Sequence, residues 1–379
     1  MRVLLVSTSE QAGGGAIAAS RLMEALNQNG VKARMLVRDK QTERITVAQV
    51  GNKLPKALER LSVLMHNGFC RRTMWLADLA NVGIDITSTE EYRQADVIHL
   101  HWVNQGMLSL RTIEKMLRDG KKVVWTLHDE WPYLGVCHYR GDCKEQECRH
   151  CPIVKGNLSH RLWQRKREIY RQGDITFVGC SQWITNQARE ALPGERVEHI
   201  NNCIPHSVFH PMDRKEARLS LHLPQDKKII LFCSQNINDE RKGMRYMEEA
   251  LCSPLFKEGH LLLRIGKGHR YISSPEEMAL TYAAADVFVT PSLQDNLPNT
   301  IAEAMSCGTP CVAFNVGGIP EMIDHLRTGY VARYRDAQDL AEGIHYVLTH
   351  DIREAAHQAA AKAYSEVHTA QEYIKIYES

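Results

Sequence analysis

The sequence predicts an α/β protein with two domains, each built on a doubly wound parallel sheet. Two observations lead to this fold class. The chain has 379 residues, which is too long for one ordinary core and suits two domains. In addition, short apolar runs rich in β-branched residues alternate with segments of helical periodicity, once in each half of the chain.

The first series of alternating segments predicts five buried parallel strands. The first strand is followed by a segment over 15–30 with apolar residues at helical spacing and Gly30 as a stop signal. Strand, helix and strand in this order are typical of a parallel sheet. The five strands are expected at 2–8, 32–38, 95–102, 121–129 and 175–181.

The second series predicts a second sheet and sets the domain boundaries. Its strands are expected at 227–234, 260–266, 285–291 and 310–315. The stretch over 201–213 has two prolines and no clear period, and we place the hinge there. We therefore expect a first domain over 1–204 with a Cys-rich insert at 137–151, a second domain over 205–360, and a carboxyl-terminal helix over 361–379 that packs back on the first domain.

Composition and charge narrow the class of protein. The formal net charge is +2, from 47 basic and 45 acidic residues, which argues against a general nucleic-acid binder. No apolar segment is long enough to cross a bilayer, and Met1 leads directly into a strand-like run, so we expect no signal peptide and a cytoplasmic protein. In that compartment the eleven Cys residues are expected to be thiols or metal ligands.

The stretch "PSLQDNLPNTIAEAMSCGTPCVAFNVGGIPEMI" over 291–323 holds two carboxylates within a frame of Gly and Pro. Asp295 lies on the loop after a predicted strand, and Glu303 follows after seven intervening residues, one turn into a predicted helix. The start of a helix suits a phosphate, and a carboxylate can accept hydrogen bonds from a pair of sugar hydroxyls. The simpler alternative is that Asp295 caps the helix and Glu303 lies on the surface.

This stretch resembles the carboxyl-terminal signature of the retaining family 4 glycosyltransferases, which have the GT-B fold of two Rossmann-like domains facing a cleft. The shared pattern is an acidic residue, seven others and Glu, followed by Ala-Met, Gly-x-Pro and a Gly-Gly-x-x-Glu turn. The resemblance covers nearly the whole chain. It implies that Glu303 binds the ribose, that Asp295 holds the donor sugar, and that Asn299 and Thr300 offer backbone N–H groups to the diphosphate. Asp295 departs from the family, which usually has the longer Glu there.

The segment "NDERKGM" supplies the cations. Its Lys242-Gly243 pair resembles the diphosphate clamp of the family, in which cations stabilise the departing nucleoside diphosphate. The family's Arg position holds Asn236 here, and Arg241 is expected to substitute. The alternative is a solvated basic turn.

A glycine loop and two His-bearing strands belong to the first half of the chain. Gly14 and Gly15 allow a ligand to approach the backbone, but the pattern is not G-x-G-x-x-G, which argues against a dinucleotide dehydrogenase. His128 lies at the end of a predicted strand, and the resemblance implies that it touches the donor sugar. For His99 and His101 a structural and a functional role stay open.

Four cysteines lie close together in "CHYRGDCKEQECRHCP". Cys137, Cys143, Cys148 and Cys151 are separated by five, four and two residues. Such a set predicts a structural zinc ion, with His138 and His150 as spare ligands. An iron–sulfur cluster, free thiols and two disulfides are the alternatives. No cofactor is expected to be needed for catalysis.

Two basic segments with apolar residues, over 69–79 and 160–172, suggest peripheral contact with the inner face of a membrane that carries a lipid-linked acceptor. A solvated helix face is the alternative.

The resemblance implies transfer of a hexosyl group, with retention, from a nucleoside diphosphate sugar to a saccharide or lipid-linked acceptor in exopolysaccharide or lipopolysaccharide biosynthesis. A nucleotide-sugar epimerase of the same fold and a non-catalytic, zinc-bearing scaffold are the alternatives. Residues 267–281 are fewer than the family has between the corresponding strands, which leaves the base open.

Overall fold

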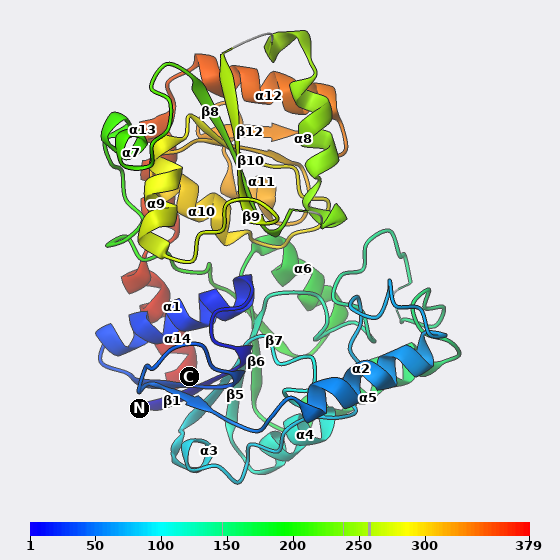
Figure 1. Ribbon diagram of the computed structural model, residues 1–379. Coiled ribbons are helices and arrows are strands. Elements are labelled where there is room, and N and C mark those ends of the chain that lie inside the picture. Colours follow the sequence, from blue (N-terminus) through cyan, green and yellow to red (C-terminus); the bar gives the residue numbers. More distant parts are fainter. Residues whose placement is uncertain (146, 238, 257–258) are drawn as a thin grey trace. The chain divides into compact units, whose positions relative to one another are not determined.

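The computed structural model describes residues 1–145, 147–237, 239–256 and 259–379. The chain divides into two units, each with its own parallel sheet. The first unit holds residues 1–201 and 367–379, and the second holds residues 202–366. The division falls at Asn201, a few residues before the boundary expected at 204, and within the predicted hinge. Figure 1 labels the elements of both units.

The first unit has a seven-stranded sheet in the order β3-β2-β1-β4-β5-β6-β7, with every neighbouring pair parallel. Its strands are β1 (Arg2–Ser9), β2 (Lys32–Asp39), β3 (Val47–Gln49), β4 (Val97–Leu100), β5 (Lys122–Leu127), β6 (Ile175–Gly179) and β7 (Arg196–His199). Its helices are α1 (Gly14–Gln28), α2 (Leu54–His66), α3 (Glu90–Gln94), α4 (Leu110–Arg118), α5 (Leu158–Tyr170) and α6 (Gln182–Ala191). The five predicted strands are all present.

The second unit has a five-stranded parallel sheet in the order β12-β11-β10-β8-β9. Its strands are β8 (Lys228–Asn236), β9 (His260–Lys267), β10 (Val287–Thr290), β11 (Cys311–Phe314) and β12 (Gly329–Ala332). Its helices are α7 (Arg214–Ser220), α8 (Met244–Leu251), α9 (Pro275–Ala284), α10 (Asn299–Ser306), α11 (Ile319–Met322), α12 (Ala337–Thr349) and α13 (Arg353–Ala363), with short 3-10 turns at Glu240–Lys242 and Pro254–Phe256.

The shortened segment that the sequence indicates lies between β9 and α9. Residues 268–274 form no helix or strand of their own, and their one bridge joins Arg270 to Ile265. In this sheet β9 lies on one side of β8 and β10 lies on the other, so the order in which successive strands are added reverses between β8 and β10. Ligands of open α/β sheets bind beyond the carboxyl ends of the strands at such a point.

The carboxyl-terminal stretch forms two helices because the helical pattern breaks at Tyr364 and Ser365. The first is α13 and the second is α14 (Glu366–Glu378). From Val367 onward the chain belongs to the first unit, where Tyr373 and Tyr377 are buried. Both hydroxyls bond to residues near the carboxyl ends of β4 and β5, as described below.

Candidate functional site

The loop and helix after β10 form the corner that the sequence predicts. Residues 291–298 connect the strand to α10, which begins at Asn299. The cap position is Pro298, with no side-chain cap and no acidic residue in the first turn. The alternative in which Asp295 caps this helix is therefore wrong. The first turn presents backbone N–H groups and the positive end of the helix dipole without an acidic side chain that would compete for them.

The glycines around this corner are required by close backbone contacts. A Cβ at Gly317 would lie 1.8 Å from the carbonyl oxygen of Asp295, and the φ of Gly317 is +59°. A Cβ at Gly243 would lie 1.9 Å from the carbonyl oxygen of Pro291, with φ at +72°. Only glycine fits either position without moving backbone. The loop that carries Asp295 is thus held between two glycine turns.

Lys242 and Asp295 form an ion pair at this corner. The Nζ of Lys242 lies 2.7 Å from Oδ2 of Asp295, and Oδ1 of Asp295 accepts a hydrogen bond of 3.1 Å from the N–H of Asn296. Lys242 follows β8 and Asp295 follows β10, and these strands are neighbours in the sheet. The fold therefore brings together two residues that the sequence separates by fifty-three positions.

Glu303 is buried on α10, with 7% of its surface exposed, so the alternative of a surface residue is wrong. The hydroxyl of Tyr282 donates a hydrogen bond of 2.9 Å to its Oε2. Burial raises the pKa of the nearby Cys233 to about 12; the charge of Glu303 adds to this rise, while that of Lys242 opposes it. Because both charges act on one thiol, Glu303 and Lys242 share the same region of the second unit.

Arg241 pairs with an acidic residue of its own turn. Its guanidinium bonds to Asp239 at 2.7 Å, and 45% of the side chain is exposed. Asn299 lies in the first turn of α10 and accepts a bond of 3.2 Å from the side-chain amide of Asn202. Thr300, in the same turn, is half-buried.

In the first unit the glycine loop packs against His128. A Cβ at Gly15 would lie 3.0 Å from Cγ of His128, which directly follows β5. Gly13, with φ at +99°, precedes α1, which begins at Gly14 and has no side-chain cap. The loop after β1 and the end of β5 therefore meet at the carboxyl edge of this sheet.

Three histidines line up behind this edge. Nδ1 of His101 lies 3.0 Å from Nε2 of His128, and the rings of His99 and His101 are 4.3 Å apart. Burial lowers the pKa of His128 to about 4, although Asp129 opposes the shift. Burial, aided by the charge of His128, lowers the pKa of His99 to about 3. These imidazoles are therefore neutral at ordinary pH, and a hydrogen bond between two neutral rings fixes the tautomer of each.

The carboxyl-terminal helix α14 completes this cluster. The hydroxyl of Tyr377 lies 2.7 Å from Nδ1 of His99, and Thr126 lies 2.8 Å from Nε2 of the same ring. The hydroxyl of Tyr373 lies 2.7 Å from that of Thr126. The two tyrosines therefore fix the ring of His99, which in turn contacts the ring of His101.

His138 has a different role from the spare zinc ligand that the sequence suggests. Nδ1 lies 2.8 Å from Asp129 and Nε2 lies 2.8 Å from Asp78. Burial opposes protonation, but the charges and hydrogen bonds of Asp129 and Asp78 prevail and raise the pKa of His138 to about 9. Asp129 also accepts a bond of 2.8 Å from the indole of Trp102. Asp129, which follows His128 in the chain, is therefore held by a buried ion pair with His138 and by the hydrogen bond from Trp102.

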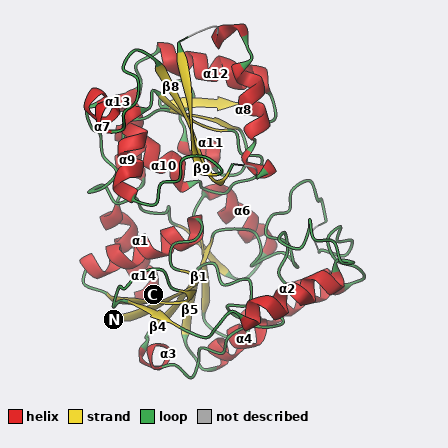
Figure 2. Cartoon of the chain, viewed as in Figure 1, coloured by secondary structure: helices red, strands yellow, loops and turns green. Residues whose placement is uncertain are grey.

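Of the four clustered cysteines, two are in direct contact. All four lie in the loop between β5 and α5, and none of them forms a disulfide; Figure 2 draws the loops of the chain in green. Cys137 and Cys151 share a hydrogen bond that raises the pKa of Cys137 and lowers that of Cys151. Sγ of Cys148 accepts a bond of 3.2 Å from Gly135 N–H. Within residues 1–145, 147–237, 239–256 and 259–379, no three His, Cys, Asp or Glu are arranged to hold a metal ion. The zinc ion stays a prediction.

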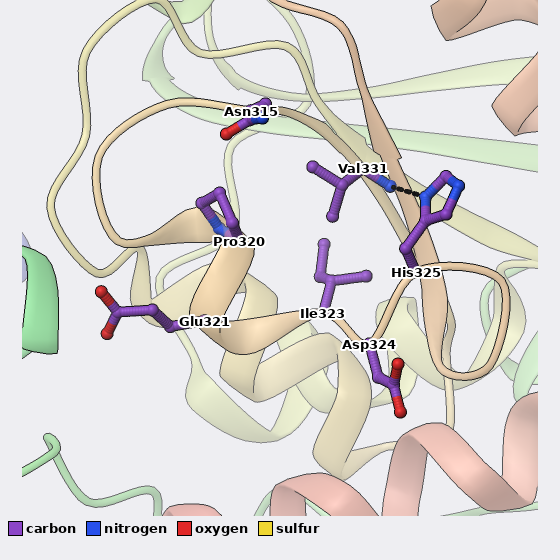
Figure 3. Close-up of a pocket in the computed structure, with 7 residues that line it drawn as sticks. All are labelled: Asn315, Pro320, Glu321, Ile323, Asp324, His325 and Val331. Carbon is purple, nitrogen blue, oxygen red and sulfur yellow. Dashed lines mark hydrogen bonds between the residues drawn. The ribbon is translucent and has the colours of Figure 1, made fainter.

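A shallow pocket lies on the second unit beside the end of β11. Its lining consists of Asn315, Pro320, Glu321, Ile323, Asp324, His325 and Val331. Figure 3 shows Ile323 and Val331 facing each other, while the carboxylates of Glu321 and Asp324 point away from them. Nδ1 of His325 accepts the Val331 N–H at 3.1 Å. None of the predicted site residues lines this pocket, and we assign it no role.

Solved structures with the same fold are GT-B glycosyltransferases. Sucrose-phosphate synthase from Thermosynechococcus elongatus is 17% identical, with a TM-score of 0.70 over 100% of this chain and 98% of that one. HepE from Anabaena, solved in complex with UDP-glucose, is 14% identical, with a TM-score of 0.65 over 99% of each chain. These likenesses show that the fold is the GT-B fold.

Family models cover most of the chain. Residues 12–208 match the model "Glycosyltransferase Family 4", and residues 227–350 match "Glycosyl transferases group 1". The chain belongs to glycosyltransferase family 4. The predicted resemblance is confirmed.

Curated relatives are distant. The N-acetyl-alpha-D-glucosaminyl L-malate synthase of Bacillus anthracis is 21% identical over 65% of this chain and 64% of its own length. The putative colanic acid biosynthesis glycosyl transferase WcaC of Escherichia coli is 23% identical over 60% and 62%. The alpha-galactosylglucosyldiacylglycerol synthase of Streptococcus pneumoniae is 23% identical over 75% and 78%. The part that matches this chain is less than two thirds of the length of the Bacillus anthracis and Escherichia coli relatives.

In the part of the chain that the structure describes, no helix is both long enough and apolar enough to cross a membrane.

Proposed function

We propose that this chain is a retaining glycosyltransferase that moves a hexosyl group from a nucleoside diphosphate sugar to a saccharide or lipid-linked acceptor. The observation that carries the proposal is the Lys242–Asp295 pair, together with the buried Glu303 and a start of α10 that has no side-chain cap. This corner lies within the part of the chain that matches the group 1 glycosyl transferase model. A cation, a helix start and a buried carboxylate are the groups that a diphosphate and a ribose require.

The second unit holds the donor in this proposal. Glu303 accepts hydrogen bonds from the ribose hydroxyls, and the N–H groups of Asn299 and Thr300 bind the diphosphate with Lys242. When the diphosphate enters, the Lys242 ammonium exchanges part of its contact with Asp295 for a phosphate oxygen. Asp295 then has an oxygen available for a hydroxyl of the sugar. Arg241 adds a cation only if it leaves Asp239.

The transfer step needs charge stabilisation on the leaving group. The bond between the anomeric carbon and the phosphate oxygen breaks, and the acceptor oxygen bonds to the same face of that carbon. The acceptor proton passes to an oxygen of the departing phosphate. Lys242 and the positive end of α10 stabilise the developing negative charge, so no metal ion is needed at the diphosphate.

In the first unit, His128 and the glycine loop are the groups that we propose to meet a sugar. His128, neutral and fixed by His101, offers a hydrogen bond to the sugar, and Gly14 and Gly15 let a ligand lie close to the backbone. A Cβ at Gly15 would press on His128 and would also fill that space.

The pathway and the donor class take support from named relatives. One relative is assigned to colanic acid biosynthesis and another is a synthase of a glycosylated diacylglycerol. HepE has been solved with UDP and with UDP-glucose. We propose a cytoplasmic enzyme of polysaccharide or lipopolysaccharide synthesis, and uridine diphosphate sugars as the first donors to test.

A thermal-shift screen of nucleoside diphosphate sugars tests the proposal, because a ligand that binds only the folded state raises the melting temperature. We expect one donor to raise it and the matching free sugar to leave it unchanged. The donor is then incubated with and without candidate acceptors. Product from donor alone would indicate an epimerase, and no shift with any donor would indicate a non-catalytic scaffold.

A further inference from the structure

Exposed apolar side chains are concentrated in one short part of the first unit. Seven of the fifteen large hydrophobic residues that are exposed in the described chain lie between residues 54 and 76. We call these seven the α2 apolar face; they are Leu54, Leu58, Leu61, Met65, Phe69, Trp75 and Leu76. Scattered exposed apolar residues need no explanation, but a cluster of this kind marks an interaction surface.

The helical members of this face form one stripe. Leu54, Leu58, Leu61 and Met65 follow one another at intervals of four, three and four residues, which places them on one side of α2. The opposite side is firmly held: the carboxylate of Glu59, fully buried, accepts the N–H groups of Leu79 at 2.7 Å and Ala80 at 2.8 Å. The apolar stripe is therefore exposed on a well-anchored helix, which lies at the surface of the first unit in Figure 1.

The loop after α2 presents two aromatic side chains at a cost in backbone energy. Phe69 is 69% exposed and has a φ of +64°, which is strained for a bulky residue. Trp75, 50% exposed, stacks on the guanidinium of Arg60 at 5.4 Å, and Arg60 donates to the carbonyl of Met74 at 2.6 Å. Ordered loops seldom hold two exposed aromatics in this way unless something covers them.

Within residues 51–77 the exposed charges beside this face have one sign, and Asp39, which also acts on Lys53 and Lys56, is paired with Arg38. Lys53, Arg71 and Arg72 are exposed and Lys56 is half-buried, whereas Glu59 is the only acidic residue between 51 and 77 and is buried. An apolar stripe flanked by cations complements the surface of a bilayer that carries anionic lipids. A protein partner or a second copy of this nearly neutral chain would not need such one-sided charge.

We propose that the α2 apolar face docks on an anionic phospholipid membrane, with the helix lying in the plane of the interface. This assigns the contact to α2 and the loop after it. The basic segment over 160–172, by contrast, forms α5, whose Lys166 is buried and donates to the carbonyls of Trp131 at 2.6 Å and Leu134 at 2.9 Å.

The position of α2 relates this docking to the acceptor. A Cβ at Gly106 would lie 2.5 Å from the backbone of Pro55, so the start of α2 packs on the loop that follows β4. Arg38, near the end of β2, donates to the carbonyl of Gln105 in the same loop. The docked helix would hold the carboxyl edge of the first sheet near lipid headgroups. This consequence, delivery of a lipid-linked acceptor, rests on the proposed function; the docking itself does not.

Vesicle flotation of the full chain tests the proposal. The probes are vesicles of phosphatidylcholine alone and vesicles with an equal share of phosphatidylglycerol. We expect binding to the anionic vesicles only, and weaker binding at about 0.5 M salt, where charges are strongly screened. Leu61→Gln with Met65→Gln should lower the partition coefficient at least about tenfold, since two apolar side chains no longer leave water. Arg71→Glu with Arg72→Glu should do the same through charge.

Matched controls lie on the second unit. Leu219→Gln with Leu326→Gln alters two exposed apolar residues, and Lys215→Glu with Lys362→Glu reverses two exposed charges. Neither pair should change flotation. The proposal would be overturned if the control pairs lost as much binding, or if the chain bound neutral vesicles equally well. It would also be overturned if sedimentation showed a dimer that Leu61→Gln with Met65→Gln dissociates. The flotation assay contains no nucleotide sugar. A chain that floats with anionic vesicles but binds no nucleotide sugar would therefore contradict the proposed function and leave the membrane proposal intact.

Discussion

A Cβ at Gly317 would lie 1.8 Å from the carbonyl oxygen of Asp295. The turn after β11 therefore fixes the loop that carries the acidic member of the ion pair, although the two residues are far apart in the sequence. The Gly-Gly turn of the family pattern thus has a physical reason in this chain. It holds the loop of Asp295 by close backbone contact.

Gly317→Ala should destabilise the second unit and displace Asp295. Gly317 has φ at +59°, so alanine there combines backbone strain with a clash, and we expect a loss of at least about 2 kcal/mol in the free energy of unfolding. Gly268→Ala is the control: its φ is +99°, but a Cβ would meet no described atom within 4 Å. That change should cost about 1 kcal/mol. Chemical denaturation compares them, and equal losses would contradict the clash.

His101 should act on the reaction through His128. His101→Phe keeps a ring but removes the hydrogen bond of 3.0 Å to His128, so we expect kcat to fall about tenfold with little change in the KM for the donor. His101→Asn places an amide near the former Nδ1 and should recover part of the loss. Steady-state kinetics measure both variants. A His101→Asn enzyme no better than His101→Phe would argue for a packing role alone.

The ion pairs of His138 should make stability depend on pH on the alkaline side. Its folded pKa of about 9 lies above the ordinary value of 6.5, so the bound proton stabilises the folded state fully below pH 6.5. The contribution fades as the pH rises through 9. The difference in unfolding free energy between the parent and His138→Gln should therefore shrink between pH 6.5 and pH 9.

The matched control for this measurement is His150→Gln, at a side chain that is 83% exposed. A decrease in this control as large as that for His138→Gln would contradict a role for the buried ion pairs. A parent–His138→Gln difference that grew with pH would mean that His138 is neutral in the folded state. The buried His99 and His128 act in the opposite range, because their lowered pKa values cost stability as the pH falls from 6.5 toward 4.

Metal analysis of the purified chain tests the Cys cluster. We expect about one zinc ion per chain, as four thiolates would hold. Cys151→Ser should release it, whereas Cys252→Ser, at an exposed position, should not. Iron and sulfide in place of zinc would favour a cluster. A metal-free chain whose Cys137 and Cys151 react with a thiol reagent would show that the two form only a thiol pair.

The sequence predicts the central strands and one edge strand, β9, but misses the other three edge strands. The strands that it fails to predict are β3, β7 and β12, and each lies at the edge of its sheet. An edge strand is less buried than a central one, so its residues include polar ones; the run Arg196–His199, for example, holds one buried residue. Periodicity in a single sequence has little to detect there.

The site is predictable where it follows a local motif. Asp295, Glu303 and the start of α10 lie within one stretch of sequence and match a specific pattern. The contacts of His138 with Asp78 and of His99 with Tyr377 join residues 60 and 278 positions apart. No local spacing contains that information, so His138 looked like a metal ligand beside cysteines. The sequence predicts Arg241 as a substitute for a family position, whereas the structure pairs Arg241 with Asp239.

Donor affinity is the most direct test of the central claim that Lys242, Glu303 and α10 form the donor site. With the donor found by thermal shift, binding is measured by isothermal titration and turnover by steady-state kinetics. Glu303→Gln and Lys242→Ala should each weaken binding or turnover at least about tenfold, equivalent to about 1.4 kcal/mol. Glu354→Gln and Lys362→Ala, both in the second unit, should match the parent. Donor binding and turnover unchanged in both Glu303→Gln and Lys242→Ala would contradict the account.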